Sequence, residues 1–583
     1  MALILIALII GLPWLGALTV LAAGNKNPKW QHGLAVGFSL ASGLMALFLI
    51  PFTSSRVALD LWLGPSFGSL SFVPDGLAVS LTIIATVIGS LAVIFSVDYM
   101  RGEAQLGRYY FLVLFFIGAM AGLVLSGNLL FTFFFWEITA LCSYGLISFY
   151  NDDPKAVAGG IKALIITQVG GVGLLVGSLL AYANLGSFQI SDLLSKANTM
   201  PADVLSIIAF CFLIAASAKS AQFPFHTWLP DAMEAPTPIS ALIHAATMVN
   251  AGIYLLARFF PAFESVPGWM EMVMLAGIVS ALITAFMALT ATDLKRTLAY
   301  STVSQLGYMV YAIGAGGVLA SQFHLLSHAV FKALLFLSAG AVIHSVGTRD
   351  MTRMGALGRK LPYVRNVFVI GALALIGLPV FNGFWSKELI LEVGLEHSPR
   401  WAYGLMLLGA ALTAFYTFRM TWLVFYGSSR ADLHVHPAGL WMKIALGVLA
   451  IGTFTTWLLF GGLSGTLAQS LPTHHLEAES TIHMVEMILL APATWLALSL
   501  IAVSLALFWF VGRGFALKES PIWLRELSES SFGFEPVNTF ISRGISGLAE
   551  QLRFTQNGQM NWNILGIVGA LLFVLAVLLW SGV

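Results

Sequence analysis

The chain has 583 residues, of which 58% are apolar and 9% are charged, and its mean hydropathy is +0.88. Soluble proteins carry about 25% charged residues, so this composition excludes a water-soluble enzyme, a nucleic-acid-binding protein and a disordered scaffold. The net charge of +1 predicts no polyanionic partner. Both cysteines, Cys142 and Cys211, lie inside apolar runs, which argues against disulfides and against a thiolate metal site.

Apolar runs of helical length recur along the chain. The first, residues 1–23, lacks a basic N-terminal region and is interpreted as a retained helix rather than a cleaved signal peptide. A helix needs about 20 apolar residues to cross a bilayer, which predicts an all-α polytopic membrane protein with about sixteen spans. Pro and Gly interrupt the seventh, eighth and twelfth spans. The predicted spans are residues 2–23, 33–52, 76–97, 109–126, 128–149, 157–184, 203–222, 237–257, 269–291, 297–316, 320–345, 364–390, 401–427, 441–462, 487–511 and 562–581.

Lys and Arg are distributed unevenly among the connecting loops. Most of the 28 basic residues follow odd-numbered spans, including Lys295 and Arg296, and the loop after the eleventh span is the richest. Only a few, such as Arg56 and Lys196, follow even-numbered spans. Because basic loops stay in the cytoplasm, the distribution predicts an inner (cytoplasmic) membrane protein with both termini outside.

Two polar segments interrupt the apolar C-terminal region. Residues 513–561 alternate charged and apolar side chains, which predicts an amphipathic helix at the cytoplasmic membrane surface. Pro521, Gly533 and Pro536 predict that this helix is broken. The loop 463–486 holds three histidines, among glutamates. A solvated outer loop is favoured there over a metal site.

Two ionisable residues stand inside predicted spans in the first half of the chain. Glu137 has apolar neighbours on both sides, and Lys219 ends the apolar stretch 207–218. Charges at membrane depth cost several kcal/mol and usually face a protein interior or a water path. The alternative for Glu137 is a helix-end carboxylate at the membrane interface. Lys219 is interpreted as a proton relay station or as a structural ion-pair partner of Glu137, and the two roles are compatible.

Four prolines between residues 224 and 238 follow Lys219. Helical hydrogen bonds cannot continue through them. Broken backbone at membrane depth is tolerated only where protein buries it or where it lines a cavity. His244 lies just after this break, and its position is compatible with a core histidine and with a functional one.

His324, His328 and Lys332 are spaced four residues apart, which places them along one face of a helix. A zinc site is disfavoured because no glutamate follows the first histidine and no carboxylate ligand is near. Histidine exchanges protons near neutral pH. The row is therefore interpreted as a proton wire.

Lys387 follows a second interruption, Gly377-Leu-Pro-Val-Phe-Asn-Gly-Phe-Trp-Ser, and Glu388 is adjacent. Lys219 and Lys387 each lie at a break, about 170 residues apart, which is typical of a transporter built from two inverted repeats.

Five blocks of the sequence resemble the antiporter-like subunits of respiratory complex I, the A and D subunits of Mrp-type cation/proton antiporters and their membrane-bound hydrogenase relatives. The resemblance is strong over about residues 70–430. The blocks are Phe135-Trp-Glu-Ile-Thr-Ala-Leu-Cys-Ser-Tyr, Lys219-Ser-Ala-Gln-Phe-Pro-Phe-His-Thr-Trp-Leu-Pro-Asp-Ala-Met, Ser240-Ala-Leu-Ile-His-Ala-Ala-Thr-Met, Phe323-His-Leu-Leu-Ser-His-Ala-Val-Phe-Lys-Ala-Leu-Leu-Phe and Gly383-Phe-Trp-Ser-Lys-Glu.

The resemblance implies a fourteen-helix antiporter-like core with two inverted five-helix repeats, broken helices and additional C-terminal helices. It implies the following roles: Glu137 and Lys219 as the pair of the first half-channel, His244 as the next station, His324, His328 and Lys332 as the central link, and Lys387 as the terminal station. Lys162, Asp231 and Glu388 are further candidates for accessory groups. His244, in place of a lysine, favours the distal complex I subunit and the Mrp A subunit. Gln168 and Gly171 stand where the distal complex I subunit usually has an arginine and an aspartate.

The expected division of the chain follows from these repeats. Residues 1–108 form an N-terminal three-helix segment, 109–258 the first inverted repeat, 259–428 the second, and 429–583 the C-terminal helices with the amphipathic segment. Each inverted repeat is expected to form one half-channel.

The leading hypothesis is a proton-translocating subunit of a multisubunit membrane complex, with exchange for Na⁺ and the identity of the parent complex left open. The alternatives are a sodium channel-like path and a membrane anchor that couples energy to a hydrogenase, an NADH/quinone oxidoreductase or a zinc protein of inorganic-carbon uptake. The sequence has no Rossmann glycine motif, no iron–sulfur cysteine set and no haem motif. No cofactor and no metal is therefore expected, and redox chemistry is expected in partner subunits. The expected partners are other membrane subunits, the lipid bilayer, protons and Na⁺, without nucleic acid.

Overall fold

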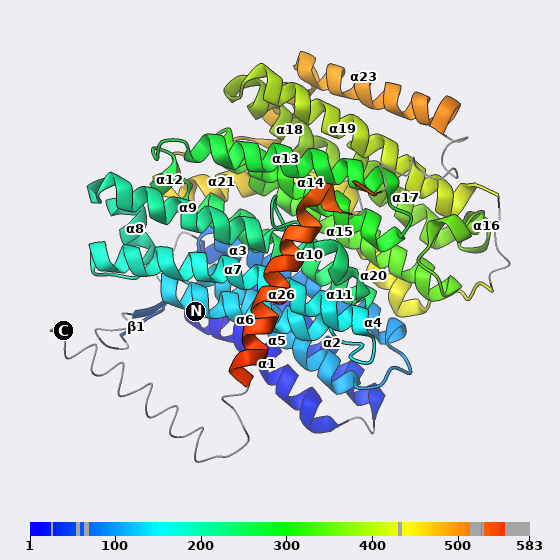
Figure 1. Ribbon diagram of the computed structural model, residues 1–583, viewed down its shortest axis with the longest axis horizontal. Helices are drawn as coiled ribbons and strands as arrows, with labels where there is room; N and C mark the ends of the chain where they lie inside the picture. Colours follow the sequence, from blue (N-terminus) through cyan, green and yellow to red (C-terminus); the bar gives the residue numbers. More distant parts are fainter. Residues whose placement is uncertain are drawn as a thin grey trace. The chain divides into compact units, whose positions relative to one another are not determined.

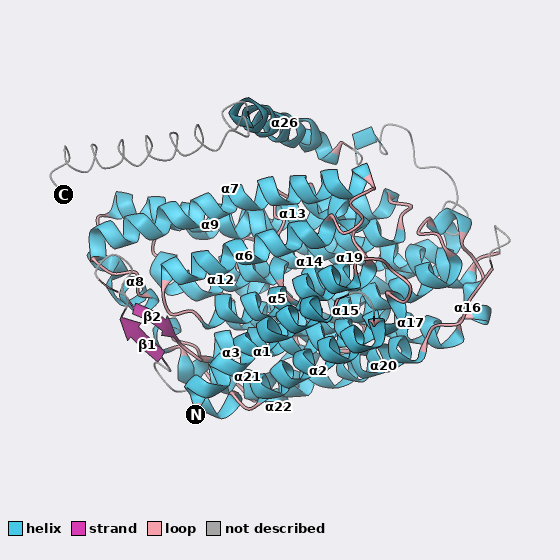
Figure 2. Ribbon diagram, turned by 90° about the horizontal axis from the view of Figure 1, so that it is seen from below, coloured by secondary structure: helices cyan, strands magenta, loops and turns pink. Residues whose placement is uncertain are grey.

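The computed structural model describes residues 1–24, 27–53, 59–62, 64, 69–428, 434–512, 526–527 and 530–553. The chain divides into two compact units, Met1–Ser528 and Glu529–Val583. In the first unit, the long helices run side by side in both ribbon views (Figure 1, Figure 2). A short β-hairpin lies at one end of these helices, and α16 (Leu357–Lys360) lies at the other. This architecture confirms the predicted all-α class.

The N-terminal half of the first unit leads to the first broken helix. Its helices are α1 (Ala2–Ala23), α2 (Pro28–Leu47), α3 (Gly76–Ile83), α4 (Gly89–Tyr99), α5 (Leu106–Leu125), α6 (Leu129–Ile147), α7 (Pro154–Leu185), α8 (Ile190–Lys196) and α9 (Ala202–Lys219), with short turns η1 (Ile50–Phe52), η2 (Ile84–Ile88) and η3 (Ala197–Thr199). The strands β1 (Leu59–Trp62) and β2 (Ser69–Phe72) pair antiparallel. The prediction of an all-helical chain missed this hairpin.

The middle of the chain runs from the first break to the second. Its elements are α10 (Trp228–Asp231), η4 (Ala232–Glu234), α11 (Thr237–Ala241), η5 (Leu242–Ala246), α12 (Met248–Phe263), α13 (Trp269–Thr290), α14 (Leu294–Gly314), α15 (Val318–Val346), η6 (Met351–Arg353), α16 and α17 (Pro362–Ile376). Here α15 is central, since it contacts α11, η5, α14, α17, α18 (Asn382–His397) and α20 (Leu440–Thr455).

The remaining elements of the first unit follow the second break. They are α18, α19 (Arg400–Thr421), η7 (Trp422–Tyr426), α20, η8 (Thr456–Leu459), α21 (Phe460–Ser470), η9 (Pro472–His474), α22 (Thr481–Leu490), α23 (Pro492–Leu507) and η10 (Phe508–Gly512). The loop predicted at 463–486 is therefore partly helical.

Twelve helices among the described residues are long and apolar enough to cross a membrane. The predicted count of about sixteen differs at four places. Helices α2 and α14 are long enough to span a membrane, but their hydropathy is lower than that of the twelve helices. The span expected at 364–390 is divided between α17 and α18. The span expected at 562–581 lies outside the described residues.

The polarity of α14 is compatible with its position inside the protein. This helix carries serine, threonine, tyrosine and glutamine side chains, yet all of its residues except Arg296 are buried. It packs along α13 at Gly277 and Gly307, where an added Cβ at either glycine would meet backbone of the facing helix within 3 Å. Hydropathy alone therefore underestimates how deeply α14 is enclosed.

The second unit contains α26 (Phe534–Arg553), preceded by the turn η11 (Ser531–Gly533). Its exposed apolar residues, including Phe540, Ile545 and Leu548, alternate with polar ones, as predicted for an amphipathic helix. The break predicted at Pro536 is wrong: the proline lies in the first turn, where its missing N–H removes no helical hydrogen bond. The expected break at Pro521 lies outside the described residues.

Candidate functional site

The first candidate residues meet where α6 passes the end of α9. Lys219 is fully buried, and its Nζ donates a hydrogen bond to the carbonyl oxygen of Trp136, 2.9 Å away. The same ammonium group lies 4.8 Å from the centroid of the Trp136 ring. No ion pair joins Lys219 to Glu137 among the described residues, although the acceptor carbonyl belongs to the residue next to Glu137. The direct ion pair considered from the sequence is therefore absent from the described contacts.

Glu137 instead contacts α7. One carboxylate oxygen accepts a hydrogen bond from the side-chain amide of Gln168. The other oxygen has no hydrogen-bond partner, and a Cβ added at Gly171 would lie 2.2 Å from it. The side-chain amide of Gln168 and the absence of a side chain at Gly171 together allow the carboxylate of Glu137 to lie directly against α7. Gln168 was noted in the sequence only as a departure from the family pattern, and the structure gives it a contact.

The chain breaks directly after Lys219. Helix α9 ends at Lys219, ahead of the prolines that begin at Pro224, and Trp228 from α10 donates its indole N–H to the carbonyl of Ala218, 3.0 Å away. Gln222 is buried within the break, and its side-chain oxygen has no hydrogen-bond partner. The predicted interruption of the seventh span is confirmed, and it places polar groups inside the bundle.

His244 lies in the π-helical turn η5, which follows α11. Its ring is fully buried, and neither ring nitrogen has a hydrogen-bond partner among the described residues. The ring centroid is 6.2 Å from that of Trp228 and 5.9 Å from that of Phe336 on α15. Two lysines, Lys295 and Lys332, are near enough to act electrostatically on the ring. His244 is thus an unpaired imidazole near two cations.

The three residues predicted to line one face of a helix do so on α15, where all are fully buried. The rings of His324 and His328 have centroids 6.3 Å apart. His328 has no hydrogen-bond partner, whereas Lys332 donates to the hydroxyl of Ser301 and, over 3.2 Å, to the carbonyl of Leu298, both on α14.

His324 also connects α15 to the second broken helix. Its Nδ1 lies 2.9 Å from the hydroxyl oxygen of Ser386, and its Nε2 lies 3.2 Å from the side-chain oxygen of Gln305. Ser386 directly precedes Lys387. The row on α15 is therefore joined to the second break by a hydrogen bond.

Lys387 forms hydrogen bonds with the C-terminal end of α17. Its Nζ donates to the carbonyl oxygens of Leu375 and Ile376, at 2.7 and 3.1 Å. These carbonyls are free because the helix stops at Gly377, whose φ of +90° suits glycine. Like Lys219, Lys387 therefore donates to main-chain carbonyls beside a broken helix.

The accessory candidates lie near both breaks. The Nζ of Lys162 lies 2.8 Å from a carboxylate oxygen of Asp231, whose other oxygen lies 3.2 Å from Arg296. Glu388 is 3% exposed and lies on α18, which packs against α23. The structure thus brings Lys162 and Asp231 together, and it places Glu388 in the interior beside Lys387.

Two charged features escaped the sequence analysis. Arg258 forms a bidentate contact with Asp75, at 2.5 and 2.8 Å, and both residues are buried. Lys295 was assigned to a cytoplasmic loop, but it is 4% exposed and donates to the carbonyl of Ala235 over 2.5 Å. The contact between Arg258 and Asp75 had one signal in the sequence: Arg258 is a charged residue inside the apolar run Leu255–Phe260. No comparable signal marks Lys295 in the sequence, because it closely follows the polar residues Thr292 and Asp293.

The histidine-containing loop also differs from its prediction. His474 is 8% exposed, and its Nε2 donates to the carbonyl of Ala257 over 2.8 Å, so it is not part of a solvated loop. Burial lowers the pKa of His474 to about 4. Among the described residues, no three His, Cys, Asp or Glu side chains are placed to hold a metal ion.

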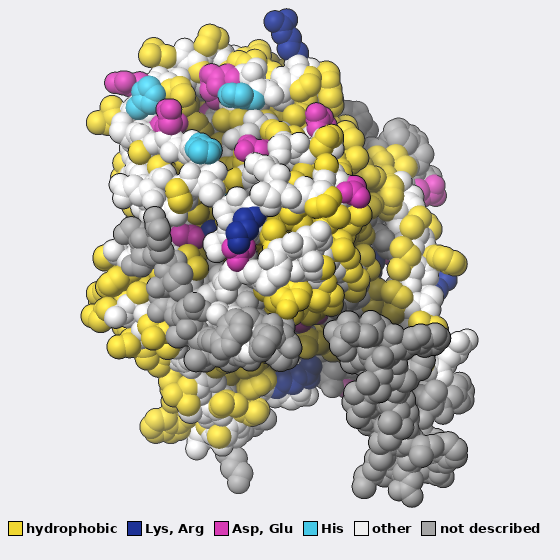
Figure 3. Space-filling view, turned by 90° about the vertical axis from the view of Figure 1, so that its left-hand side faces the viewer, with side chains coloured by type: hydrophobic (Ala, Val, Ile, Leu, Met, Phe, Trp, Pro, Cys, Tyr) yellow, Lys and Arg dark blue, Asp and Glu magenta, His cyan; other side chains and the backbone are white. Residues whose placement is uncertain are grey.

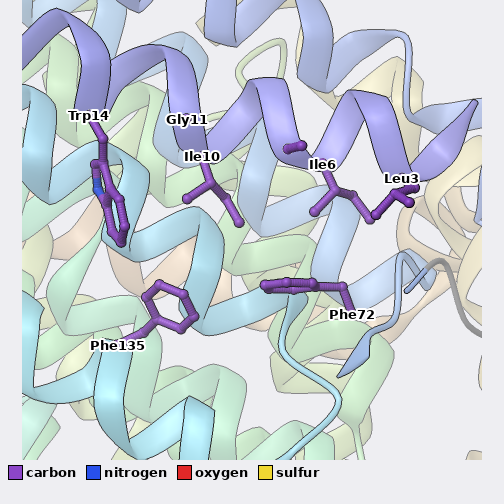
Figure 4. Close-up of a pocket in the computed structure, with 8 residues that line it drawn as sticks. Leu3, Ile6, Ile10, Gly11, Trp14, Phe72 and Phe135 are labelled. Atoms are coloured by element: carbon purple, nitrogen blue, oxygen red, sulfur yellow. The ribbon is translucent and has the colours of Figure 1, made fainter. Parts of the chain in front are cut away.

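An apolar cavity of about 250 Å³ lies beside α1. Figure 4 shows Ile10 and Trp14 of α1 on one side, and Phe72 and Phe135 on the other. The lining residues are all apolar, and the cavity therefore offers no group that could bind an ion or carry a proton.

The comparisons with known proteins agree on one family. Residues 126–413 match the family model described as "NADH:quinone oxidoreductase/Mrp antiporter, TM", and residues 66–110 match that of "NADH-Ubiquinone oxidoreductase (complex I), chain 5 N-terminus". The chain is 36% identical to NADH-quinone oxidoreductase subunit L of Pseudomonas aeruginosa, over 94% of this chain and 96% of that protein. It is 43% identical to NAD(P)H-quinone oxidoreductase chain 5 of Picosynechococcus sp., over 62% of this chain and 56% of that protein.

Two solved structures are also similar. A chain of the Mrp complex from Dietzia sp. matches with a TM-score of 0.79 and 28% identity, over 100% of this chain and 63% of that chain. A chain of an archaeal membrane-bound sulfane sulfur reductase shares the fold, with a TM-score of 0.72 and 24% identity, over 82% of this chain and 99% of that chain. By its near full-length similarity to subunit L and by the family models that it matches, the chain belongs to the NADH:quinone oxidoreductase/Mrp antiporter family of membrane subunits.

Proposed function

We propose that the chain, a multi-pass membrane protein and a proton-translocating subunit of a multisubunit membrane complex, moves protons along a buried axis. The axis consists of Glu137, Lys219, His244, Lys332, His328, His324 and Lys387, in that spatial order. The observation that carries the proposal is the complete burial of five of these groups, with Lys387 at 1% exposure, inside helices of a membrane protein. Such groups are costly in an apolar interior and mark ion pathways.

The broken helices supply the lysines with partners. Lys219 donates to Trp136, and Lys387 donates to Leu375 and Ile376. A lysine ammonium group forms strong, charge-assisted hydrogen bonds to such carbonyl oxygens. A neutral lysine amine, which also carries an acceptor lone pair, forms weaker hydrogen bonds to them. Gain and loss of a proton therefore change where each lysine is held, which is the property that a relay station needs.

Electrostatic repulsion provides the coupling between stations. His244 is influenced by Lys332, and both Lys332 and His324 are influenced by Lys387. Two like charges close together in a protein interior repel strongly. A proton that loads one station therefore favours release from its neighbour, so protons advance stepwise along the axis.

Each inverted repeat would form one half-channel. Residues 109–258 contain Glu137 and Lys219, and residues 259–428 contain Lys387 and α15. The segments 1–108 and 429–583 would flank these halves. The use of main-chain carbonyls by both lysines supports this division, since equivalent parts of two repeats are expected to work alike.

The end of the helices that carries the hairpin would face the outside of an inner (cytoplasmic) membrane, with both termini on that side. Figure 3 shows this end: acidic and histidine side chains lie among hydrophobic ones, and few Lys or Arg side chains are visible. The opposite end holds α16 with Arg359 and Lys360. Basic residues remain on the cytoplasmic side, which supports this orientation.

Other membrane subunits would complete the pathway, as the relatives named in complexes suggest. Glu137 is only partly buried, whereas the later stations are enclosed. The first station is therefore the one most open to the surroundings of the chain. Exchange of protons for Na⁺ is tested by measuring proton flux in vesicles that contain the assembled complex, with and without a Na⁺ gradient.

The proposal is tested with Lys219→Met in the assembled complex, reconstituted into vesicles. The expected proton flux is lower by at least about tenfold, because a positioned proton-transfer group contributes about 10²–10⁴ in rate. Lys196→Met is the matched control, since Lys196 is half-exposed and pairs with Asp192 on α8. Unchanged flux in an intact Lys219→Met complex would refute the role of Lys219.

A further inference from the structure

Lys295 and Arg296 are adjacent in sequence but lie in different environments. The side chain of Arg296 is 40% exposed and pairs with Asp231. Lys295 is 4% exposed and points to the backbone that follows the first break, where Ala235 accepts its hydrogen bond. An exposed cation at a helix start needs no explanation, whereas a buried lysine without a carboxylate partner does.

Two carboxylates lie close to Lys295 along the chain: Asp293 is two residues before it, and Glu234 directly precedes its acceptor Ala235. Asp293 and Glu234 both influence its charge electrostatically. Each is bound to Arg349, with contacts of 2.7 Å from Nε to Asp293 and 2.7 Å from Nη2 to Glu234. No ion pair among the described residues joins Lys295 to either carboxylate. The acidic groups are thus neutralised by Arg349, and Lys295 remains outside the pairs.

Lys295 lies on α14, which packs against η5, the turn that carries His244. His244 is influenced by the charge of Lys295 more strongly than by that of Lys332. Its ring nitrogens have no hydrogen-bond partner. Lys295 belongs to the second half of the chain, whereas Ala235 and His244 belong to the first. Lys295 therefore donates to the backbone of the first half from a helix that packs against the turn carrying His244, next to a partly exposed ion cluster.

We propose that Lys295 is an additional proton-transfer station, which connects the cluster of Asp293, Glu234 and Arg349 with His244. This inference rests on the proposed function and adds a lateral access route to its axis. A hydronium ion that reaches the cluster from water gives its proton to the neutral amine of Lys295, which becomes an ammonium group, while both carboxylates stay paired with Arg349. The ammonium group then gives a proton to a ring nitrogen of neutral His244, directly or through water, and returns to the amine.

A purely structural lysine would have the same hydrogen bond to Ala235, so the test must separate the two roles. Lys295→Arg keeps a positive charge and several donors, but arginine does not release its proton in proteins. Lys295→Gln keeps an amide NH2 group, which can donate hydrogen bonds, without a charge. A structural role is rescued by arginine or glutamine, whereas a proton-transfer role is rescued by neither.

The experiment measures proton flux in vesicles that contain the complex, after co-purification of its subunits has confirmed assembly. For Lys295→Arg and Lys295→Gln we expect flux to fall by about tenfold or more. Arg296→Gln, the neighbouring cation, is the matched control and is expected to keep its flux. Wild-type proton flux in either assembled Lys295 variant would overturn the inference. Failure of both variants to assemble would also overturn it, because that result indicates a structural role for Lys295.

Lys219→Met is measured in parallel to separate the two claims. Loss of flux in Lys219→Met with normal flux in the Lys295 variants would reject the additional station alone. Normal flux in Lys219→Met would reject the proposed axis itself, whatever the Lys295 variants do.

Discussion

The side-chain amide of Gln168 donates a hydrogen bond to the carboxylate of Glu137, and this contact ties α7 to α6 at the first station of the proposed axis. It is the single hydrogen bond that the described residues give this carboxylate, because its other oxygen has no partner. The orientation of the first station therefore depends on one neutral side chain.

Replacement of Gln168 by leucine should impair proton transfer at Glu137. A hydrogen bond to a charged group contributes about 1.5–3 kcal/mol, so its loss should lower proton flux by about tenfold. Asn184→Ala is the control on the same helix, since its amide bonds only to Leu180 of α7. Equal flux in Gln168→Leu and wild-type vesicles would show that this contact does not position the carboxylate.

Gly277→Val should destabilise the contact between α13 and α14. A Cβ at this position would lie 2.4 Å from the backbone nitrogen of Tyr311, which cannot move without shifting α14. Overpacking of this kind costs about 1–3 kcal/mol, so the thermal midpoint in detergent should fall. Gly404→Val on α19 has open space around it and should change the midpoint less. The same midpoint for both variants would contradict the close packing.

Asp75→Asn should be among the most destabilising single changes. Asparagine can still cap α3, but it leaves the guanidinium of Arg258 buried without its carboxylate. Loss of one partner of a buried pair costs about 3–5 kcal/mol. Asp192→Asn removes an exposed pair with Lys196 and should cost about 0–1 kcal/mol. Thermal unfolding of both variants decides this, and a small effect of Asp75→Asn would mean that Arg258 finds another partner.

His474 should make stability depend on pH. Its pKa is lowered to about 4 by burial, whereas an unfolded histidine has a pKa of about 6.5. Between these values the unfolded state binds a proton that the folded state does not, so stability is present above about pH 6.5 and is lost as the pH falls toward 4. The loss is at most about 3 kcal/mol.

The measurement is the thermal midpoint at pH 7 and pH 5 for wild type, His474→Gln and His475→Gln. The drop in midpoint on acidification should be smaller in His474→Gln, which has no group to protonate. His475 is exposed, and its replacement should leave the drop unchanged. An equal drop in all three proteins would contradict the assignment to His474.

The sequence predicts those parts of the site that local rules determine. Clusters of proline and glycine interrupt helices, so the breaks beside Lys219 and Lys387 were predictable, whereas single prolines such as Pro13 and Pro261 lie inside helices. The four-residue spacing of His324, His328 and Lys332 fixes their common face of α15, whatever surrounds the helix.

The partners of these groups could not be predicted, because tertiary contacts determine them. Lys219 binds a carbonyl of α6, and Asp75 pairs with Arg258 across 183 positions of sequence. Lys295 follows Asp293 in a polar stretch that resembles a loop, and only the packing of α14 buries it. The number of spans is not confirmed by hydropathy for a similar reason: residues 297–316 were predicted as a span and do form the long helix α14, but its polar side chains lower its hydropathy because protein surrounds it.

The central claim is that one continuous axis joins the two halves through Lys332. The most direct measurement is proton flux through vesicles that contain the assembled complex with Lys332→Met, compared with Lys360→Met at the exposed end of α16. We expect flux to be lost in Lys332→Met and retained in Lys360→Met. Full flux in an assembled Lys332→Met complex would contradict it, because protons would then cross without the link between Lys219 and Lys387.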